Sequence, residues 1–246
     1  MEDLGSEHTP DAVARRLLGG PKESYSRELV YGAVDGAVTT FAVVAGARGA
    51  SVSMSIVVVL GLANLLADGF SMAVGNYLGV RTSEERRRRV RAEELEHIAH
   101  VPEGEREEVR QIYEAKGFTG DDLERVVEVV TEDHERWVQT MLVEEHGFTT
   151  VAPQPLRTAT ATFVAFCVAG LLPLTPFLIE LAATWPVGDP FVSSAVATGV
   201  AFVAIGVARG AITELSRVRT AAQTLGLGGG AAVLAFGVGH VLRGVV

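Results

Sequence analysis

The chain has 246 residues, of which 48% are hydrophobic, and its formal net charge is −9. Charged residues are scarce in several long apolar stretches, and most of the 30 Asp and Glu residues lie between Glu84 and Glu145, so the composition excludes one soluble domain with an evenly charged surface. The single cysteine, Cys167, excludes an internal disulfide and a thiolate metal site within one subunit. Metal ligands must then be oxygen, imidazole or thioether groups.

The apolar stretches number five and predict membrane spans. At about 1.5 Å per residue, each is long enough for a hydrocarbon core of roughly 30 Å. They cover about residues 29–49, 53–79, 158–181, 191–209 and 226–246. Four pairs of glycines have the small-xxx-small spacing that favours close helix packing in lipid: Gly32/Gly36, Gly75/Gly79, Gly206/Gly210 and Gly226/Gly230.

These spans define the expected fold class and domain organisation. We expect an all-α integral membrane protein with five transmembrane helices and a cytosolic three-helix metal-binding insertion between spans two and three. The expected parts are a polar tail at 1–24, spans one and two at 25–82, the insertion at 83–152, and spans three to five at 153–246.

The distribution of Lys and Arg predicts the orientation. Residues 1–28 are polar and mixed in charge, so no cleavable signal peptide is expected and the first span should remain in place. With the amino terminus inside, all 21 Lys and Arg residues except Arg48 and Arg243 lie on the cytosolic side, in agreement with the positive-inside rule. The insertion is therefore expected in the cytosol.

Polar residues within the first two spans are candidates for an ion path. The second span carries Asn64, Asp68, Met72 and Asn76, spaced by four and so on one helix face. A carboxylate at mid-membrane costs about 2.5–3.5 kcal/mol on insertion scales, so Asp68 should face protein or water. Asp35 lies well inside the first span, and the short connection between the two spans makes them antiparallel neighbours. The two carboxylates are expected to line one path.

The insertion is expected to form three helices. The first continues the second span to about His100, the second covers about 103–116, and the third covers about 119–147. The third has an apolar stripe at helical spacing, formed by Leu123, Val126, Val127, Val130, Trp137 and Met141. The first is expected to pack through Ala92, Leu95, Ile98 and Ala99, with its opposite face carrying Glu93, Glu94, His97 and His100.

Carboxylates and imidazoles one turn apart recur on these helices. Glu105 and Glu108 share a face with Val109, and Glu145 follows Met141 by one turn. One such pair is typical of a solvated acidic face, but their recurrence on three helices favours a metal site. An inert acidic scaffold is the alternative interpretation.

Four motifs make the chain resemble the vacuolar iron transporter family over about residues 25–246: DGAVTTFAVVAG, ADGFSMAVGNYLG, VPEGEREEVRQIYEAKG and MLVEEHG. The resemblance implies five spans per subunit and a dimer with the ion path along its two-fold interface. It implies export of Fe(II) from the cytosol coupled to protons. It also implies pore roles for Asp35 and Met72, and metal binding by Glu94, Glu105, Glu108, Met141 and Glu145.

Three positions depart from the family pattern. His97 stands where a further glutamate is expected, Leu142 replaces a second methionine, and Asn76 replaces an acidic residue. His97 can still bind metal as neutral imidazole, but it adds no negative charge. We include it among the candidate ligands.

The predicted function is a transporter of Fe(II), with Mn(II) as a second candidate, and not an enzyme. Expected partners are divalent ions, protons, membrane lipid and a second copy of the chain, without nucleic acid; Co(II) and Zn(II) are expected to bind in vitro, and no permanent cofactor is expected. The alternative is a di-iron carboxylate ferroxidase using the Glu94-x-x-His97 motif, although that chemistry expects the motif on two helices. The expected membrane is the plasma membrane in a prokaryote and the vacuolar membrane in a eukaryote.

Overall fold

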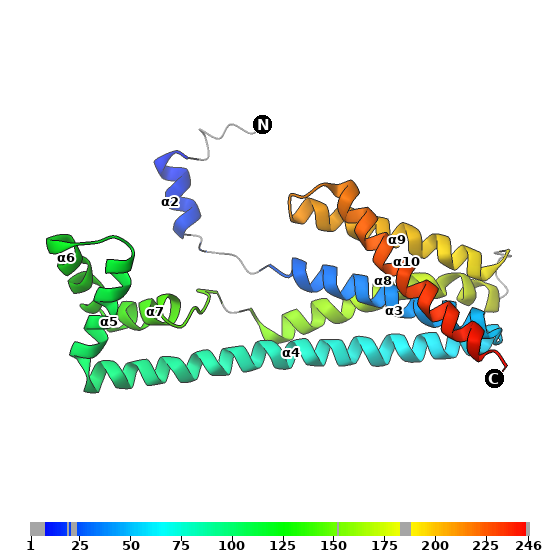
Figure 1. Cartoon of the computed structure of the whole chain (residues 1–246), viewed down its shortest axis with the longest axis horizontal. Helices are drawn as coiled ribbons and strands as arrows, with labels where there is room; N and C mark the ends of the chain where they lie inside the picture. Colours follow the sequence, from blue (N-terminus) through cyan, green and yellow to red (C-terminus); the bar gives the residue numbers. More distant parts are fainter. Residues whose placement is uncertain (1–7, 19, 21–23, 152, 183–187, 245–246) are drawn as a thin grey trace. The chain divides into compact units, whose positions relative to one another are not determined.

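The computed structural model describes residues 8–18, 20, 24–151, 153–182 and 188–244, and all regular structure among them is helical (Figure 1). The helices are α2 (Pro10–Leu18), α3 (Ser26–Ala50), α4 (Met54–His100), α5 (Pro102–Ala115), α6 (Gly120–Thr131), α7 (His134–Glu144), α8 (Pro155–Leu181), α9 (Pro190–Ile212) and α10 (Arg217–Leu242). The chain divides into two compact units. The insertion unit comprises residues 1–23 and 79–153, and the membrane unit comprises residues 24–78 and 154–246.

Five helices, α3, α4, α8, α9 and α10, are long and apolar enough to cross a membrane. The prediction of an all-helical protein with five spans is therefore confirmed. The last span begins at Arg217, earlier than expected, because the Ser216 side chain caps the helix by accepting a hydrogen bond from the Arg219 backbone N–H.

Glycines bring the helices of the membrane unit into backbone contact. A Cβ added to Gly36 of α3 would lie 2.2 Å from the Phe166 carbonyl oxygen of α8, and one added to Gly206 of α9 would lie 2.4 Å from Ala221 Cα of α10. Packing without a hydrophobic driving force depends on such close approach. The expectation is confirmed for two glycine pairs, whereas the other two have open space beside them among the described residues: Gly75/Gly79 and Gly226/Gly230.

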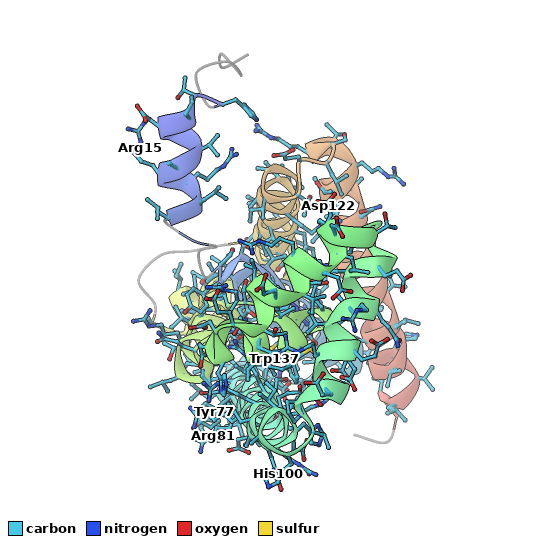
Figure 2. All side chains as sticks on the ribbon, turned by 90° about the vertical axis from the view of Figure 1, so that its left-hand side faces the viewer. Arg15, Tyr77, Arg81, His100, Asp122 and Trp137 are labelled. Carbon is cyan, nitrogen blue, oxygen red and sulfur yellow. The ribbon has the colours of Figure 1, made fainter. Side chains whose placement is uncertain are left out.

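The insertion unit has an ordinary apolar core. Its buried members are Ile98, Val109, Leu123, Val127, Val130, Trp137, Val138, Met141 and Leu142. Trp137, which Figure 2 labels, is only 3% exposed. The predicted apolar stripe is confirmed as part of this core.

The prediction of one helix over 119–147 was wrong, because this segment forms α6 and α7. The backbone of Asp133 is extended, and its carboxylate accepts a hydrogen bond from the Arg136 N–H, which starts a new helix. The Arg136 side chain also donates to the Val129 carbonyl of α6. The insertion therefore contains the end of α4 followed by three separate helices.

Candidate metal centre and ion path

The strongest cluster of potential metal ligands lies in the insertion unit. Glu94 of α4 is only 3% exposed, and its Oε1 lies 2.9 Å from Nε2 of His146 in the turn after α7. The same nitrogen lies 3.6 Å from Oε2 of Glu145. These three residues each offer one donor atom, all within 4.8 Å of one another, which is a spacing that one cation can bridge.

A second pair of donors belongs to the same acidic neighbourhood. Glu105 of α5 is 4% exposed, and its Oε1 lies 3.3 Å from Nδ1 of His97. The remaining carboxylate oxygens, Oε2 of Glu94 and Oε2 of Glu105, are buried without a hydrogen-bond partner among the described residues. Buried carboxylate oxygens without partners are costly, so their arrangement fits a bound cation.

The carboxylates of this cluster repel one another. The pKa of Glu105 is raised to about 7, first by burial and then by the negative charges of Glu108, Glu94 and Glu145, with His97 opposing the shift. Burial also raises the pKa of Glu145, with His146 opposing the shift and Glu108 and Glu94 adding to it. A divalent cation would relieve this mutual repulsion.

His146 owes its position to the end of α7. Gly147 has a φ of +68°, which glycine adopts readily, and the Phe148 N–H donates to the Leu142 carbonyl at 2.9 Å. This turn directs the chain back and places His146 beside Glu94. Sequence reasoning missed His146 as a ligand, although its place between a candidate ligand and a helix-ending glycine was a usable signal.

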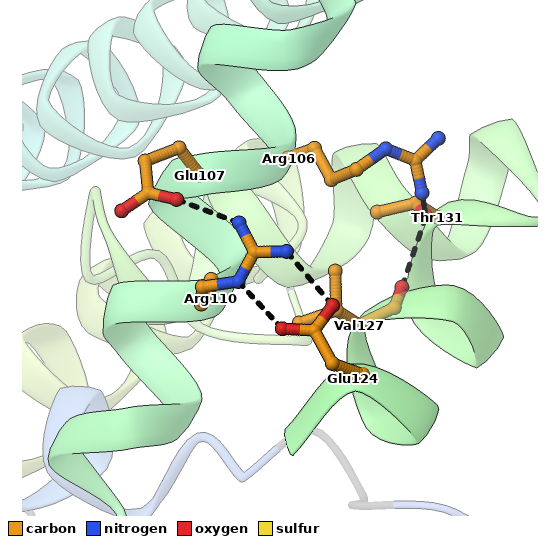
Figure 3. Close-up of polar contacts among 6 residues, drawn as sticks. All are labelled: Arg106, Glu107, Arg110, Glu124, Val127 and Thr131. Atoms are coloured by element: carbon orange, nitrogen blue, oxygen red, sulfur yellow. Dashed lines mark hydrogen bonds and ion pairs between the residues drawn. The ribbon is translucent and has the colours of Figure 1, made fainter. Parts of the chain in front are cut away.

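Other acidic residues of the insertion unit are neutralised by arginine and do not join the centre. Arg110 of α5 donates to both carboxylate oxygens of Glu124 in α6, at 3.0 and 2.9 Å, and to Glu107 at 2.7 Å (Figure 3). Hydrogen bonds from Gln111 and Arg110 lower the pKa of Glu107, and Arg110 lowers that of Glu124. Arg106 completes the α5–α6 contact by donating to Thr131 Oγ1 at 2.6 Å.

The structure brings together four of the predicted ligands, Glu94, His97, Glu105 and Glu145. Glu108 is exposed, contrary to the expectation that it faces the packed side, but it lies within electrostatic range of Glu105. Met141 is 0% exposed within the apolar core. Glu94 and His97 contact different partners, His146 and Glu105, so the Glu-x-x-His motif does not act as one pair.

The predicted apolar face at the end of α4 is confirmed for Ile98 and wrong for Ala92, Leu95 and Ala99. Glu94 and Ile98 are buried, whereas Leu95 is 37% exposed and Ala92 and Ala99 are exposed. Helical periodicity cannot distinguish a buried carboxylate from a solvated one. The partner that accounts for the burial of Glu94, His146, lies far away in sequence.

In the membrane unit, Asp35 and Asp68 are close enough to interact electrostatically. Asp35 on α3 is half-buried, and Asp68 on α4 is exposed in the single chain. Met72 and Asn76 line a cavity of about 290 Å³ between α3, α4 and α8. Asn76 donates to Thr162 Oγ1 of α8 at 2.7 Å, so the amide at this position connects two spans.

Glu28 is a further acidic residue that sequence reasoning missed. It lines the same cavity as Met72, and its Oε2 is buried without a hydrogen-bond partner among the described residues. Glu28 and Asp35 are seven residues apart and so lie on one face of α3, which was the available signal.

Five candidate spans around polar and acidic side chains define a multi-pass membrane protein. The model of the VIT family matches residues 26–240, and the chain belongs to this family. The predicted resemblance to the vacuolar iron transporter family is thus confirmed.

Named relatives agree with this assignment. A vacuolar iron transporter of Toxoplasma gondii is 33% identical over 261 residues, covering 100% of this chain and 85% of the relative. Vacuolar iron transporter 1 of Arabidopsis thaliana is 31% identical, covering 88% of this chain and 86% of the relative. Vacuolar iron transporter 1 of Eucalyptus grandis is 30% identical, covering 93% of each chain.

Proposed function

We propose that this protein is a membrane transporter that moves Fe(II), and Mn(II) as a second substrate, out of the cytosol in exchange for protons. The observation that carries the proposal is the pair Asp35 and Asp68, two carboxylates within electrostatic range in membrane-spanning helices. Carboxylates at this depth are costly unless they meet protein, water or a cation. The names of the relatives supply the metal.

The donor chemistry supports a divalent ion of this kind. Carboxylate and imidazole groups suit Fe(II) and Mn(II), and the thioether of Met72 favours Fe(II) as the softer of the two. A path carboxylate that releases a metal ion can take up a proton, which would couple the two movements. Asp35, Asp68 and Met72 are the proposed path residues, and Glu28 extends them along α3.

The insertion unit is proposed to capture the metal. Its ligands are Glu94, His97, Glu105, Glu108, Met141 and Glu145, with His146 added from the geometry. The proposed orientation places this unit and the amino terminus in the cytosol. Asp68 is exposed in the single chain, and burial against a second copy would remove this carboxylate from lipid, so we propose a homodimer.

Flux into proteoliposomes tests the transport proposal. Vesicles containing the protein should take up Fe(II) faster than empty vesicles, and Asp35→Asn or Met72→Ala should reduce the protein-dependent rate at least about tenfold, a change equivalent to about 1.4 kcal/mol. Met54→Ala is the matched control, because Met54 lies on the same helix but outside the cavity. Equal uptake by protein-containing and empty vesicles under several pH gradients would contradict the proposal.

A further inference from the structure

A second cavity of the membrane unit combines basic and apolar walls. It has a volume of about 420 Å³ and lies between the start of α3 and the end of α9. Its lining includes Arg27, Val30, Tyr31, Val34, Arg209 and Ile212. Arg27 and Tyr31 also line the cavity that contains Met72 and Glu28, whereas Val30, Val34, Arg209 and Ile212 do not. The second cavity therefore requires a separate explanation.

Neither arginine of this cavity pairs with a carboxylate within the part of the chain that the structure describes. Arg27 makes no hydrogen bond or ion pair with another described residue. Arg209 donates through Nη2 to the amide oxygen of Gln223 at 2.6 Å, and no carboxylate pairs with it in the described part of the chain. Two guanidinium groups lining one cavity repel each other unless an anion lies between them.

Besides the arginines, the cavity is lined by three hydroxyl-bearing residues, Ser26, Tyr31 and Thr213, and by three aliphatic residues of membrane-spanning helices, Val30, Val34 and Ile212. Val30 and Val34 are one turn apart on α3, and Ile212 is 52% exposed at the end of α9. Aliphatic side chains offer an apolar surface to an acyl chain and no hydrogen-bond donor to a small soluble anion. The cavity therefore has a wall for a charged headgroup and a wall for hydrocarbon.

We propose that this cavity binds an anionic phospholipid. The phosphate lies between Arg27 and Arg209, because guanidinium groups bind phosphate through paired, charge-assisted hydrogen bonds. An acyl chain lies along Val30 and Val34. The proposed orientation assigns this lipid to the cytosolic leaflet, whose anionic lipids are recognised by basic pockets between spans.

Lipid titration of the purified full-length protein in detergent, without metal, tests this site. Phosphatidylglycerol should raise the thermal unfolding midpoint, whereas phosphatidylcholine with the same chains and soluble glycerol phosphate should not. In Arg27→Gln/Arg209→Gln, the phosphatidylglycerol concentration needed for half of the effect should increase at least about tenfold. Arg219→Gln is the matched control, because Arg219 is exposed in the neighbouring segment but outside the cavity, and its response should equal that of the wild type.

Three results would overturn the proposal: no response of the wild type to phosphatidylglycerol, an unchanged response in the double variant, or an equal response to glycerol phosphate, which indicates a site for soluble anions. If the double variant fails to fold, Arg27→Gln alone replaces it, since Arg27 is exposed and has no bonded partner among the described residues. The single variant must weaken the response on its own. Because no metal is present, these results are independent of the transport assay.

Discussion

The two units of the chain hold their helices together by different means. In the membrane unit, glycines such as Gly36 bring backbones into contact, beside a cluster of large side chains that includes Phe41 of α3 and Leu174 of α8. In the insertion unit, a core of large apolar side chains lies beside carboxylates that repel one another. The membrane unit should therefore be sensitive to added volume, whereas the insertion unit should be sensitive to removed volume and to metal.

The largest expected effect is cavity formation in the insertion unit. Met141→Ala and Leu142→Ala each remove a fully buried side chain from the same core and should each cost about 2–5 kcal/mol of local stability. Hydrogen exchange of α5–α7 amides measures this loss. The pair also tests Met141 as a ligand: Mn(II) affinity should fall further in Met141→Ala, and equal affinity in both variants would contradict a role for its sulfur.

The second largest effect on stability is expected from added volume between helices of the membrane unit. Gly36→Ala places a methyl group 2.2 Å from the Phe166 carbonyl oxygen, so α3 and α8 must separate, at a cost of about 1–3 kcal/mol. Gly75→Ala is the control, because that position has open space and alanine favours a helix by about 0.5–1 kcal/mol over glycine. Thermal unfolding in detergent should show opposite shifts, and a shared direction would contradict the role of close backbone approach.

The raised pKa of Glu105 predicts that metal binding by the insertion unit depends on pH, which would distinguish this unit from the membrane unit. Its pKa of about 7 means that the folded protein retains a proton that the unfolded chain releases, so the contribution of this group to stability falls as pH rises from about 4.5 to 7. A metal ion must displace this proton. Mn(II) affinity should therefore increase up to about tenfold per pH unit below 7 and level off above it.

Calorimetric titration of the full chain between pH 5.5 and 8 measures this slope. The Glu105→Gln variant should bind Mn(II) weakly, and its Mn(II) affinity should depend little on pH because the titrating carboxyl group is absent. Glu107→Gln, which changes a neighbouring carboxylate already bonded to Arg110, should retain the slope of the wild type. A slope that persists in Glu105→Gln would assign the titration to another group.

The smallest effect is expected at the surface of the insertion unit. Arg110→Gln removes the ion pairs with Glu107 and Glu124, which are exposed and screened by salt. Hydrogen exchange of α5 and α6 should change less than in Met141→Ala, and the difference should diminish at high salt. A change as large as that of the core variants would mean that the arginine positions α5 against α6.

The sequence predicted those features that depend on local composition. Span length and hydropathy predict five transmembrane helices, and helical spacing predicts the core around Val127 and Trp137. The α6–α7 break depends on one side chain, Asp133, capping a helix within a stretch whose apolar period does not change. The spacing of apolar residues therefore cannot predict this break between α6 and α7.

The candidate sites divide in the same way. Asp35 was predicted because a carboxylate within an apolar span is unusual, and Glu105 and Glu145 because donors one turn apart recur on these helices and match the family motifs. The role of His146 and the burial of Glu94 were not predicted. These two side chains contact each other across a sequence separation of 52 residues, and the contact accounts for both. Pairings of this kind depend on the fold.

The location of His146 in a turn has a kinetic consequence. The carboxylates of Glu94 and Glu105 belong to the helices α4 and α5, whereas His146 depends on a glycine-containing connection that can shift without unwinding a helix. Loop movements occur within nanoseconds to microseconds, so in the proposed centre this imidazole would be able to detach and rebind while Glu94 and Glu105 stay in place. Such a detachable donor would let the proposed centre release its ion rapidly, as the proposed transport function requires.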